Sequence, residues 1–297
     1  MPGCARRRRS RACHVSGCRG PAGPPVTRET TLRTDAPRRT RKAAAFVLVL
    51  TVLAGCALNK GSALAAGFEQ EWAGTPDVAE IDAKGSNSLP FLGTASGTLV
   101  VAEGTPADRV TELAADLRRY VADQDGVEGR IEADGVAFTV VADKARTDEV
   151  VALWRSLTAD TRVRRADIDD TAGDGDRWRI DVDTADATEA MAVFRDLLSG
   201  GGRHEPLSAA TFLGVGTWLD ARPSLHVETG SDGRAPGEAI AAYEALRARY
   251  TIIEARLKPD RATISLAPGA DLDAAAALAG AAAPSLGANL KITSGRG

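Results

Sequence analysis

Cysteine is scarce in this chain, and its distribution excludes several kinds of chemistry. The 297 residues include 4 cysteines, of which Cys4, Cys13 and Cys18 lie close to the N-terminus and Cys56 is the last. The part of the chain after residue 18 contains one cysteine, so it forms no internal disulfide bond, no thiol pair and no cysteine zinc site. Its hydrophobic core must therefore stabilise it without cross-links.

Apolar runs long enough to cross a membrane are also lacking. The run at residues 43–58 follows a basic cluster at residues 38–42, and it is shorter than the ~18 to 20 residues that span a bilayer. A basic segment, a short apolar segment and small residues at its end form a secretory signal. We therefore interpret residues 1–55 as a signal peptide, and a start codon read too far upstream explains residues 1–25.

The apolar run contains the four residues Leu53-Ala54-Gly55-Cys56. They resemble the lipobox of bacterial lipoproteins, in which a leucine and two small residues precede the cysteine that becomes residue one. The resemblance implies cleavage between Gly55 and Cys56, lipidation of the Cys56 sulfur, and a chain held on the extracytoplasmic face of the cell membrane. An unmodified cysteine in a signal anchor is the alternative. Residues 56–76, rich in alanine and glycine, would follow as a lipidated tether.

Positive charge is concentrated in the predicted signal peptide. Twelve of the 37 basic residues, but two of the 40 acidic residues, lie in residues 1–55. The chain from Cys56 onwards thus carries 25 basic and 38 acidic residues, a net charge of −13. This charge repels phosphate backbones, so nucleic acid is not an expected partner. It also repels anionic lipid headgroups, which leaves the acyl anchor as the expected membrane contact.

The body contains the same helical pattern five times. In each copy, apolar residues recur at positions i, i+3, i+4 and i+7, which places them in one stripe along a helix. Between the copies, apolar and polar residues alternate, as at Trp178, Ile180 and Val182, which is typical of strands with one face in water. The helical stripes span residues 110–117, 150–157, 190–197, 239–246 and 272–279.

These patterns predict an α+β fold in which a strand–strand–helix (ββα) unit occurs five times and a strand at 289–293 closes the chain. Successive βαβ crossovers would interleave into tandem ferredoxin-like (βαββαβ) units, with helices on one face of antiparallel sheets. We expect a first domain with a leading hairpin at 77–170 and a second, with an extra βαβ unit, at 176–297. The boundary would lie in the acidic, glycine-rich residues 167–176. One continuous sheet is the competing architecture.

Few residues are candidates for chemistry. His226 and Glu228 lie on the same side of an alternating strand, and His204 precedes Glu205 in a predicted loop after three glycines. An imidazole beside a carboxylate could bind a metal ion or accept a proton, but a solvated strand face or loop explains each residue more simply. The acidic run at 167–176 departs twice from the EF-hand pattern and is more typical of a hairpin turn. We therefore assign no catalytic residue, cofactor or metal ion from the sequence.

Two further features of the sequence concern the sheet. Trp154, Trp178 and Trp218 fall on predicted core faces, which we interpret as packing and not as a carbohydrate-binding platform. Gly214 and Gly216 alternate on a predicted strand, where a bulge or a close backbone approach is the usual reason for glycine.

The sequence favours an envelope lipoprotein whose non-catalytic body presents a polar sheet face to an envelope protein, a wall polymer or a small ligand. Two alternatives stay open. Paired split βαβ domains resembling ACT modules would form an amino-acid sensor with a cleft between the halves. Dispersed aspartate and glutamate side chains would form an envelope hydrolase if two carboxylates met in a concave site. No pattern predicts the oligomeric state.

Overall fold

The computed structural model describes residues 59–89, 92–170, 177–199, 203–204, 207–218 and 221–295. All of these residues belong to one unit, which extends from Val49 to Gly297. The predicted signal peptide, with its cleavage site at Gly55 and Cys56, lies outside the described residues. Within the described part, no helix combines the length and the apolar character that crossing a membrane requires.

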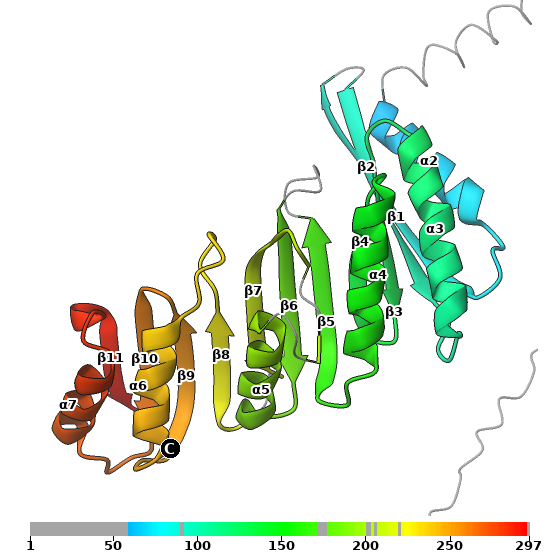
Figure 1. Cartoon of the computed structure of the whole chain (residues 1–297). Helices are drawn as coiled ribbons and strands as arrows, with labels where there is room; N and C mark the ends of the chain where they lie inside the picture. Colours follow the sequence, from blue (N-terminus) through cyan, green and yellow to red (C-terminus); the bar gives the residue numbers. More distant parts are fainter. Residues whose placement is uncertain are drawn as a thin grey trace, which may run out of the picture. The chain divides into compact units, whose positions relative to one another are not determined.

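Eleven strands of the described residues form a single sheet, and strands that are neighbours in the sheet are also consecutive in the chain (Figure 1). In strands such as β3, buried residues alternate with more exposed ones, because successive side chains point to opposite faces. The strands are β1 (Val78–Leu89), β2 (Leu92–Val101), β3 (Val127–Ala133), β4 (Val136–Val140), β5 (Val163–Asp170), β6 (Trp178–Thr184), β7 (Ala210–Thr217), β8 (Ser224–Glu228), β9 (Ile252–Lys258), β10 (Arg261–Leu266) and β11 (Leu290–Ser294).

Two kinds of connection alternate along the sheet. Strands β1 and β2 pair antiparallel as a hairpin, whereas β2 and β3 pair parallel and are joined through a helix. The alternation continues to β10 and β11, which are parallel. A parallel step needs a crossover, and a one-sided helix supplies both the crossover and a cover for the apolar face of the sheet.

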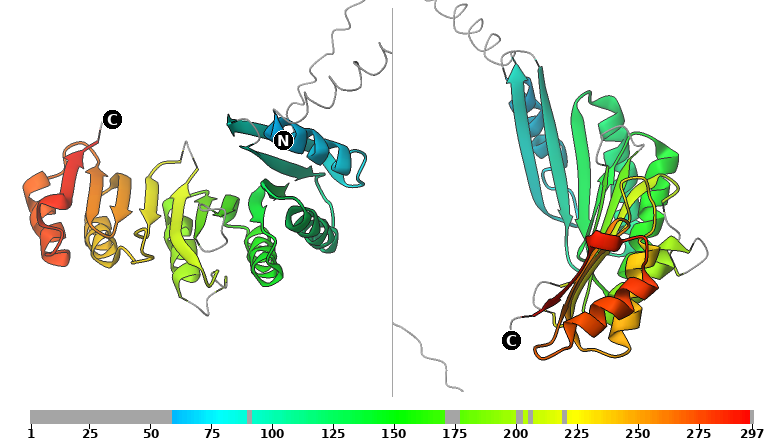
Figure 2. Two further views of the ribbon diagram at one scale, coloured as in Figure 1. Left: turned by 90° about the horizontal axis from the view of Figure 1, so that it is seen from above. Right: turned by 90° about the vertical axis from the view of Figure 1, so that its left-hand side faces the viewer.

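Six α-helices of the described part lie on one face of the sheet (Figure 2). The five predicted helices are confirmed, and in α3 the residues Val110, Leu113, Ala114 and Leu117 are buried. Asp186 caps α5 by accepting hydrogen bonds from two backbone N–H groups. The helices are α2 (Lys60–Trp72), α3 (Ala107–Asp123), α4 (Lys144–Thr158), α5 (Ala187–Leu198), α6 (Gly237–Arg247) and α7 (Leu272–Ala282), and a short 3-10 helix (Gly287–Asn289) precedes β11.

The strand order corrects the predicted ferredoxin-like arrangement. An interleaved unit would insert a strand between the two strands that a crossover joins, whereas β2 and β3 pair directly with each other. The sheet is also mixed and not antiparallel. Pairing continues from β5 to β6, across the predicted domain boundary, so the observed architecture is the competing one, a continuous sheet. Side-chain periodicity predicted strands and helices, but it carries no information on which strands pair.

Helix α2 corrects the predicted tether at residues 56–76. Gly61, Ala65, Phe68 and Trp72 are buried at helical spacing, and α2 packs on β1 and β2. The stripe is weak in the sequence because two of its four residues are glycine and alanine. With α2 in place, the described body consists of successive αββ units, each of which contacts its neighbours as in a repeat protein.

An aromatic cluster docks α2 on the sheet. The ring centroid of Phe68 lies 6.2 Å from that of Trp72 and 5.6 Å from that of Tyr120 on α3. A Cβ on Gly97 of β2 would lie 2.5 Å from the Phe68 ring, so only glycine leaves room for this ring. Trp72 is therefore part of the core.

Candidate functional site

The face of the sheet opposite the helices is left open by the described elements (Figure 2). Its polar side chains form rows across the strands, because residues in register point to the same side. Arg130 of β3, for example, donates to Asp167 and Asp169 of β5 at 2.7 and 2.6 Å. Opposite charges thus neutralise each other along part of this face, including the described start of the acidic run at 167–176.

Strand β7 forms the floor of a trough on the open face. Gly214 and Gly216 alternate with Leu213 and Val215, whose side chains belong to the core, and all four residues are buried. Both glycines therefore face away from the helices. The side chains of Asp181 and Phe212 cover Gly214, because a Cβ there would lie 2.6 Å from Asp181 Oδ1 and 3.1 Å from the Phe212 ring. The open space between β6 and β8 therefore lies above Gly216. We call this space the glycine trough.

Four ionisable side chains wall the glycine trough. Asp181 and Asp183 on β6, and His226 and Glu228 on β8, stand in register with the two glycines. A Cβ on Gly216 would lie 3.1 Å from His226 Nδ1 and 3.9 Å from Asp183 Oδ1. The imidazole and the carboxylate thus flank Gly216 from opposite sides. A side chain at this position would crowd the imidazole, whereas the distance to the carboxylate is an ordinary van der Waals contact.

His226 and Glu228 lie together, as the sequence predicts. His226 Nε2 lies 2.8 Å from Glu228 Oε2, and Lys258 Nζ on β9 donates to the other carboxylate oxygen at 2.5 Å. Burial alone would raise the pKa of Glu228, but the hydrogen bonds from Lys258 and His226 lower it. Glu228 is therefore held ionised as a hydrogen-bond acceptor. Sequence reasoning missed Lys258, because its place beside Glu228 depends on which strands pair.

Asp183 has the opposite electrostatic environment. Burial raises the pKa of its carboxyl group, and the charge of Asp181 adds to this effect, while Arg165 and His226 oppose it. Asp183 on β6, which takes up a proton more readily, thus lies diagonally across β7 from Glu228 on β8, which is held ionised. Such a wall can both accept and donate hydrogen bonds.

Aromatic rings lie at both ends of β7. The guanidinium of Arg179 lies 4.2 Å from the ring centroid of Phe212, which is a cation–π contact. Trp218, which follows β7, is 42% exposed, so the prediction that it packs in the core is wrong. The strand's alternation carries Trp218 to the same face as the glycines. Trp154 and Trp178 are buried as predicted.

The glycine trough opens into a groove of about 590 Å³ that reaches from β6 to β9 and is lined in part by Trp218 and His226. The charges of its lining balance, because three carboxylates stand against three permanently charged bases. The carboxylates belong to Asp183, Glu228 and Glu254, and the bases are Arg222, Arg256 and Lys258.

The structure does not bring His204 to this groove. His204 is fully buried in a second cluster, which we call the buried knot. Its Nε2 lies 3.0 Å from Asp160 Oδ2, and its Nδ1 lies 2.9 Å from Ser156 Oγ on α4. Arg162 binds both oxygens of Asp160 and also reaches Asp196 at 2.6 Å. The sequence gives no signal for this cluster, because its members are up to 48 residues apart.

The buried knot contains serine, histidine and aspartate in contact, which are the residue types of a catalytic triad. Ser156 Oγ, however, donates to the carbonyl oxygen of Leu153 at 3.0 Å. The side chains of Asp160 and His204 are both fully inaccessible, so a substrate does not reach them. We conclude that the cluster ties His204 to α4 and is structural.

The carboxylate of Asp160 is stabilised in its charged form. Burial alone would raise its pKa, but hydrogen bonds from the side chain and backbone of Arg162 and from His204 hold the pKa well below the usual value. A buried carboxylate of this kind is stable only while its partners are present.

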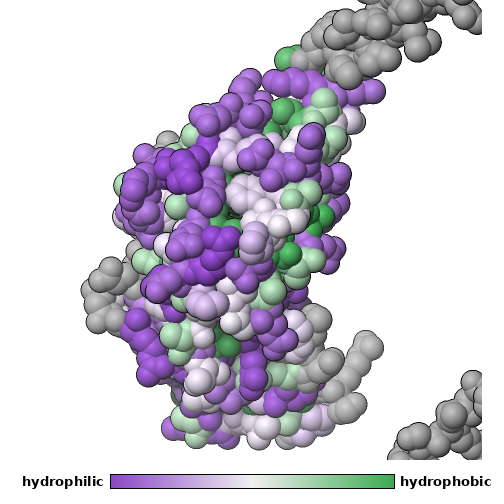
Figure 3. Space-filling view, turned by 90° about the vertical axis from the view of Figure 1, so that its right-hand side faces the viewer, coloured by the Kyte–Doolittle hydropathy of each residue, from purple (hydrophilic) through white to green (hydrophobic). Residues whose placement is uncertain are grey.

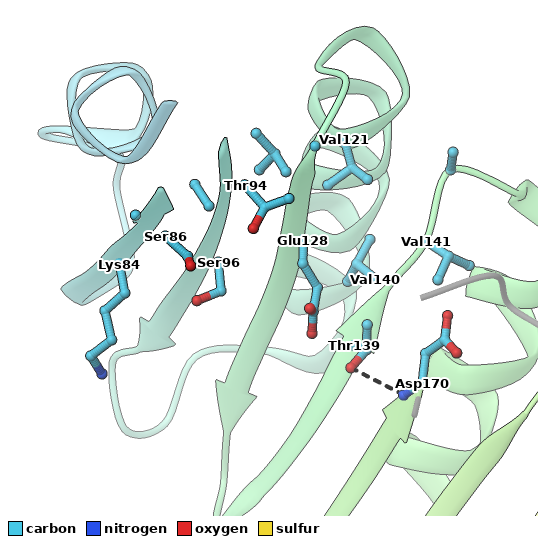
Figure 4. A pocket seen from close by; sticks show the side chains of 15 residues that line it. Lys84, Ser86, Thr94, Ser96, Val121, Glu128, Thr139, Val140, Val141 and Asp170 are labelled. Atoms are coloured by element: carbon cyan, nitrogen blue, oxygen red, sulfur yellow. Dashed lines mark hydrogen bonds between the residues drawn. The ribbon is translucent and has the colours of Figure 1, made fainter. Parts of the chain in front are cut away.

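A second hollow, of about 580 Å³, extends over strands β1 to β5 (Figure 4). Lys84, Ser96 and Glu128 stand in one row across its strands. Burial raises the pKa of Glu128, and the charge of Asp169 adds to this. Lys84 extends away from Glu128 and pairs with Asp82, and Ser96 makes no hydrogen bond to another described side chain. The row therefore contains no activated nucleophile.

Exposed apolar side chains are few. The surface seen in Figure 3 is largely hydrophilic, with small scattered apolar areas. Among the described residues, the exposed large apolar side chains are Leu92, Leu198 and Trp218. Of these three, Trp218 is the one that lines the groove of the glycine trough.

Within the described residues, no group of three or more histidine, cysteine, aspartate or glutamate side chains could hold a metal ion. Comparison of the chain with protein-family models, curated proteins and solved structures finds no match. The functional argument therefore rests on the residues of this chain.

Proposed function

We propose that this chain is a membrane-anchored lipoprotein of the cell envelope, held through Cys56 on the extracytoplasmic side, whose body binds a partner on the open sheet face without catalysing a reaction. The glycine trough carries the binding part of this proposal, because it combines a concave floor, walls that donate and accept hydrogen bonds, and an exposed indole. The segment Leu53-Ala54-Gly55-Cys56 carries the anchoring part.

The position of the trough supports a binding role. Its walls lie on strands of a packed sheet and not on loops, so the core fixes the spacing of Asp183 and His226. The two hydroxyl groups in the lining, those of Thr217 and Ser224, make no hydrogen bond to His226 in the described part of the chain. The lining thus offers recognition groups but no activated nucleophile.

The sensor alternative loses its main support. It requires a ligand site at the interface of two paired domains, whereas β5 and β6 pair from Val163 and Thr184 to Asp170 and Trp178. The described residues therefore provide one sheet at that position and no interface between halves.

One observation favours an envelope hydrolase as a second candidate function. Asp183 and Glu228 wall the same trough, and their environments shift their pKa values in opposite directions, as in sites that pair an acid with a base. Chain-length analysis of an oligosaccharide after incubation with the protein separates the two functions. A binding protein returns the oligosaccharide unchanged, whereas a hydrolase shortens it and loses this activity in Asp183→Asn.

The anchor is tested by expressing the full chain in a bacterium that processes lipoproteins. We expect the protein in the membrane fraction and Cys56, carrying lipid, as the N-terminal residue in mass analysis. Cys56→Ser abolishes the lipid, whereas the control Cys18→Ser leaves it in place. A processed protein without lipid at Cys56 would contradict the proposal.

The binding part is tested by sedimentation of the purified protein with washed cell-wall fragments. We expect the wild-type protein in the pellet and the double variant Asp183→Asn, Trp218→Ala in the supernatant. Leu92→Ala is the control, because Leu92 is 60% exposed but lies outside the trough lining. Equal sedimentation of all three proteins, or none by the wild type, would show that the trough is not the binding site.

A further inference from the structure

We propose that the glycine trough recognises an uncharged saccharide chain, with the indole of Trp218 against a sugar ring and the side chains of Asp183 and His226 bonded to sugar hydroxyl groups. The inference rests on the proposed binding function and assigns the chemical class of the ligand.

The charge balance of the groove argues for an uncharged ligand. Its three carboxylates and three permanent bases cancel, and Glu228 is already bonded to Lys258 and His226. Glu254 is likewise paired with Arg256 at 3.0 Å. A charged ligand would lose its hydration on entry without gaining a net opposite charge, whereas an uncharged polar ligand avoids this loss.

The hydrogen-bonding groups of the trough fit hydroxyl groups. A hydroxyl group donates one hydrogen bond and accepts others, so it matches a wall that holds both acceptors and donors. Asp183 Oδ1 and His226 Nδ1 face the space above Gly216 from opposite sides. A ligand hydroxyl lying in the groove between these two groups could bond to both.

Trp218 supplies the apolar contact that a sugar ring requires. A sugar ring has an apolar face of C–H groups and a polar edge, and a partly exposed indole has a matching flat surface. Trp218 lines both the groove and a second hollow of about 360 Å³. Each of these two spaces is large enough to hold part of a ligand. A chain of several sugars could therefore continue past the ring.

The test is isothermal titration calorimetry of the purified protein with four β-linked or α-linked hexasaccharides of different charge. Cellohexaose and the hexamer of N-acetylglucosamine are uncharged, the hexamer of glucosamine is cationic, and the hexamer of galacturonic acid is anionic. We expect at least one uncharged hexamer to bind, and neither charged hexamer to bind more tightly than it.

Two variants place the ligand in the trough. Trp218→Ala removes the stacking surface, and Gly216→Val fills the space between Asp183 and His226. Each should weaken binding about tenfold or more, as loss of a central aromatic contact does in other interfaces. Gly280→Val is the matched control, because a Cβ on Gly280 of α7 meets no atom within 4 Å, and it should leave affinity unchanged.

Each other outcome overturns the inference. Tighter binding of a charged hexamer refutes the ligand class, and equal affinity of the wild type and both trough variants refutes the site. Absence of any binding to uncharged hexamers by a protein that still sediments with wall fragments refutes the saccharide and leaves the proposed binding function intact. Thermal unfolding of each variant shows that it is folded before its affinity is compared.

Discussion

The two histidines of the body, His204 and His226, each lie beside a carboxylate, yet they occupy opposite environments. The side chains of His204 and Asp160 are fully buried, whereas that of His226 is 42% exposed and that of Glu228 is 14% exposed. A buried pair of this kind is costly to break, and a solvated pair contributes little to stability. The same residue types therefore serve the fold in one place and remain available to a ligand in the other.

The largest effect on stability is expected at the buried knot. Asp160→Asn leaves Arg162 and His204 without their carboxylate, and breaking a buried pair in this way costs about 3 kcal/mol or more. Urea denaturation at neutral pH measures the loss. The control is Asp148→Asn on α4, whose carboxylate is 62% exposed and paired with Lys144, and its cost should stay below about 0.5 kcal/mol. Equal costs would contradict the structural role of the knot.

A direct comparison of the two histidines gives the next largest effect. His204→Ala removes one hydrogen bond from each of Asp160 and Ser156 and leaves a cavity where the buried imidazole was, at about 2 to 3 kcal/mol. His226→Ala removes an exposed partner of Glu228 and should cost less than about 1 kcal/mol. The free energies of unfolding from the same denaturation assay rank the two, and the reverse ranking would refute the assignment.

Acid should remove the contribution of the knot. Because the folded protein lowers the pKa of Asp160, its stabilising effect is complete above the unfolded value of about 3.9 and declines as the pH falls below it. The difference in unfolding free energy between wild type and Asp160→Asn should therefore be constant from neutral pH to about pH 5 and shrink towards pH 3. A difference that grows on acidification would have the wrong sign.

The smallest effect concerns Lys258. Lys258→Met removes one of the two hydrogen bonds that lower the pKa of Glu228, so that pKa should rise while the unfolding free energy falls by less than about 1 kcal/mol. Carbon NMR of the Glu228 carboxyl group during a pH titration measures the shift. Arg234→Met is the control, because Arg234 lies outside the groove lining and pairs loosely with Asp232 at 3.9 Å. An unchanged Glu228 pKa in Lys258→Met would show that the ammonium does not act on it.

The sequence predicted the parts of the site that depend on one strand and missed those that depend on pairing between strands. A period of two placed His226 beside Glu228 and put Gly214 and Gly216 on one face. The same reasoning could not place Asp183 opposite His226, because they meet only through the register of β6, β7 and β8. Trp218 was misplaced because its exposure depends on where β7 ends.

The fold shows the same division. Apolar stripes predicted five helices, while α2 was missed because Gly61 and Ala65 give its buried stripe little hydrophobicity. The spacing of apolar residues also left open whether the strands of successive crossovers interleave in the sheet or follow one another in chain order. The continuous sheet follows from contacts between residues that are distant in the sequence, which a single sequence does not display.

The most direct test of the two environments is NMR of the imidazole groups in the processed protein. Three histidines occur in the chain, and His14 lies in the predicted signal peptide, so only His204 and His226 give signals. Titration with an uncharged hexasaccharide should shift the His226 resonances and leave those of His204 unchanged. Movement of the His204 signals with unchanged His226 signals would contradict the account.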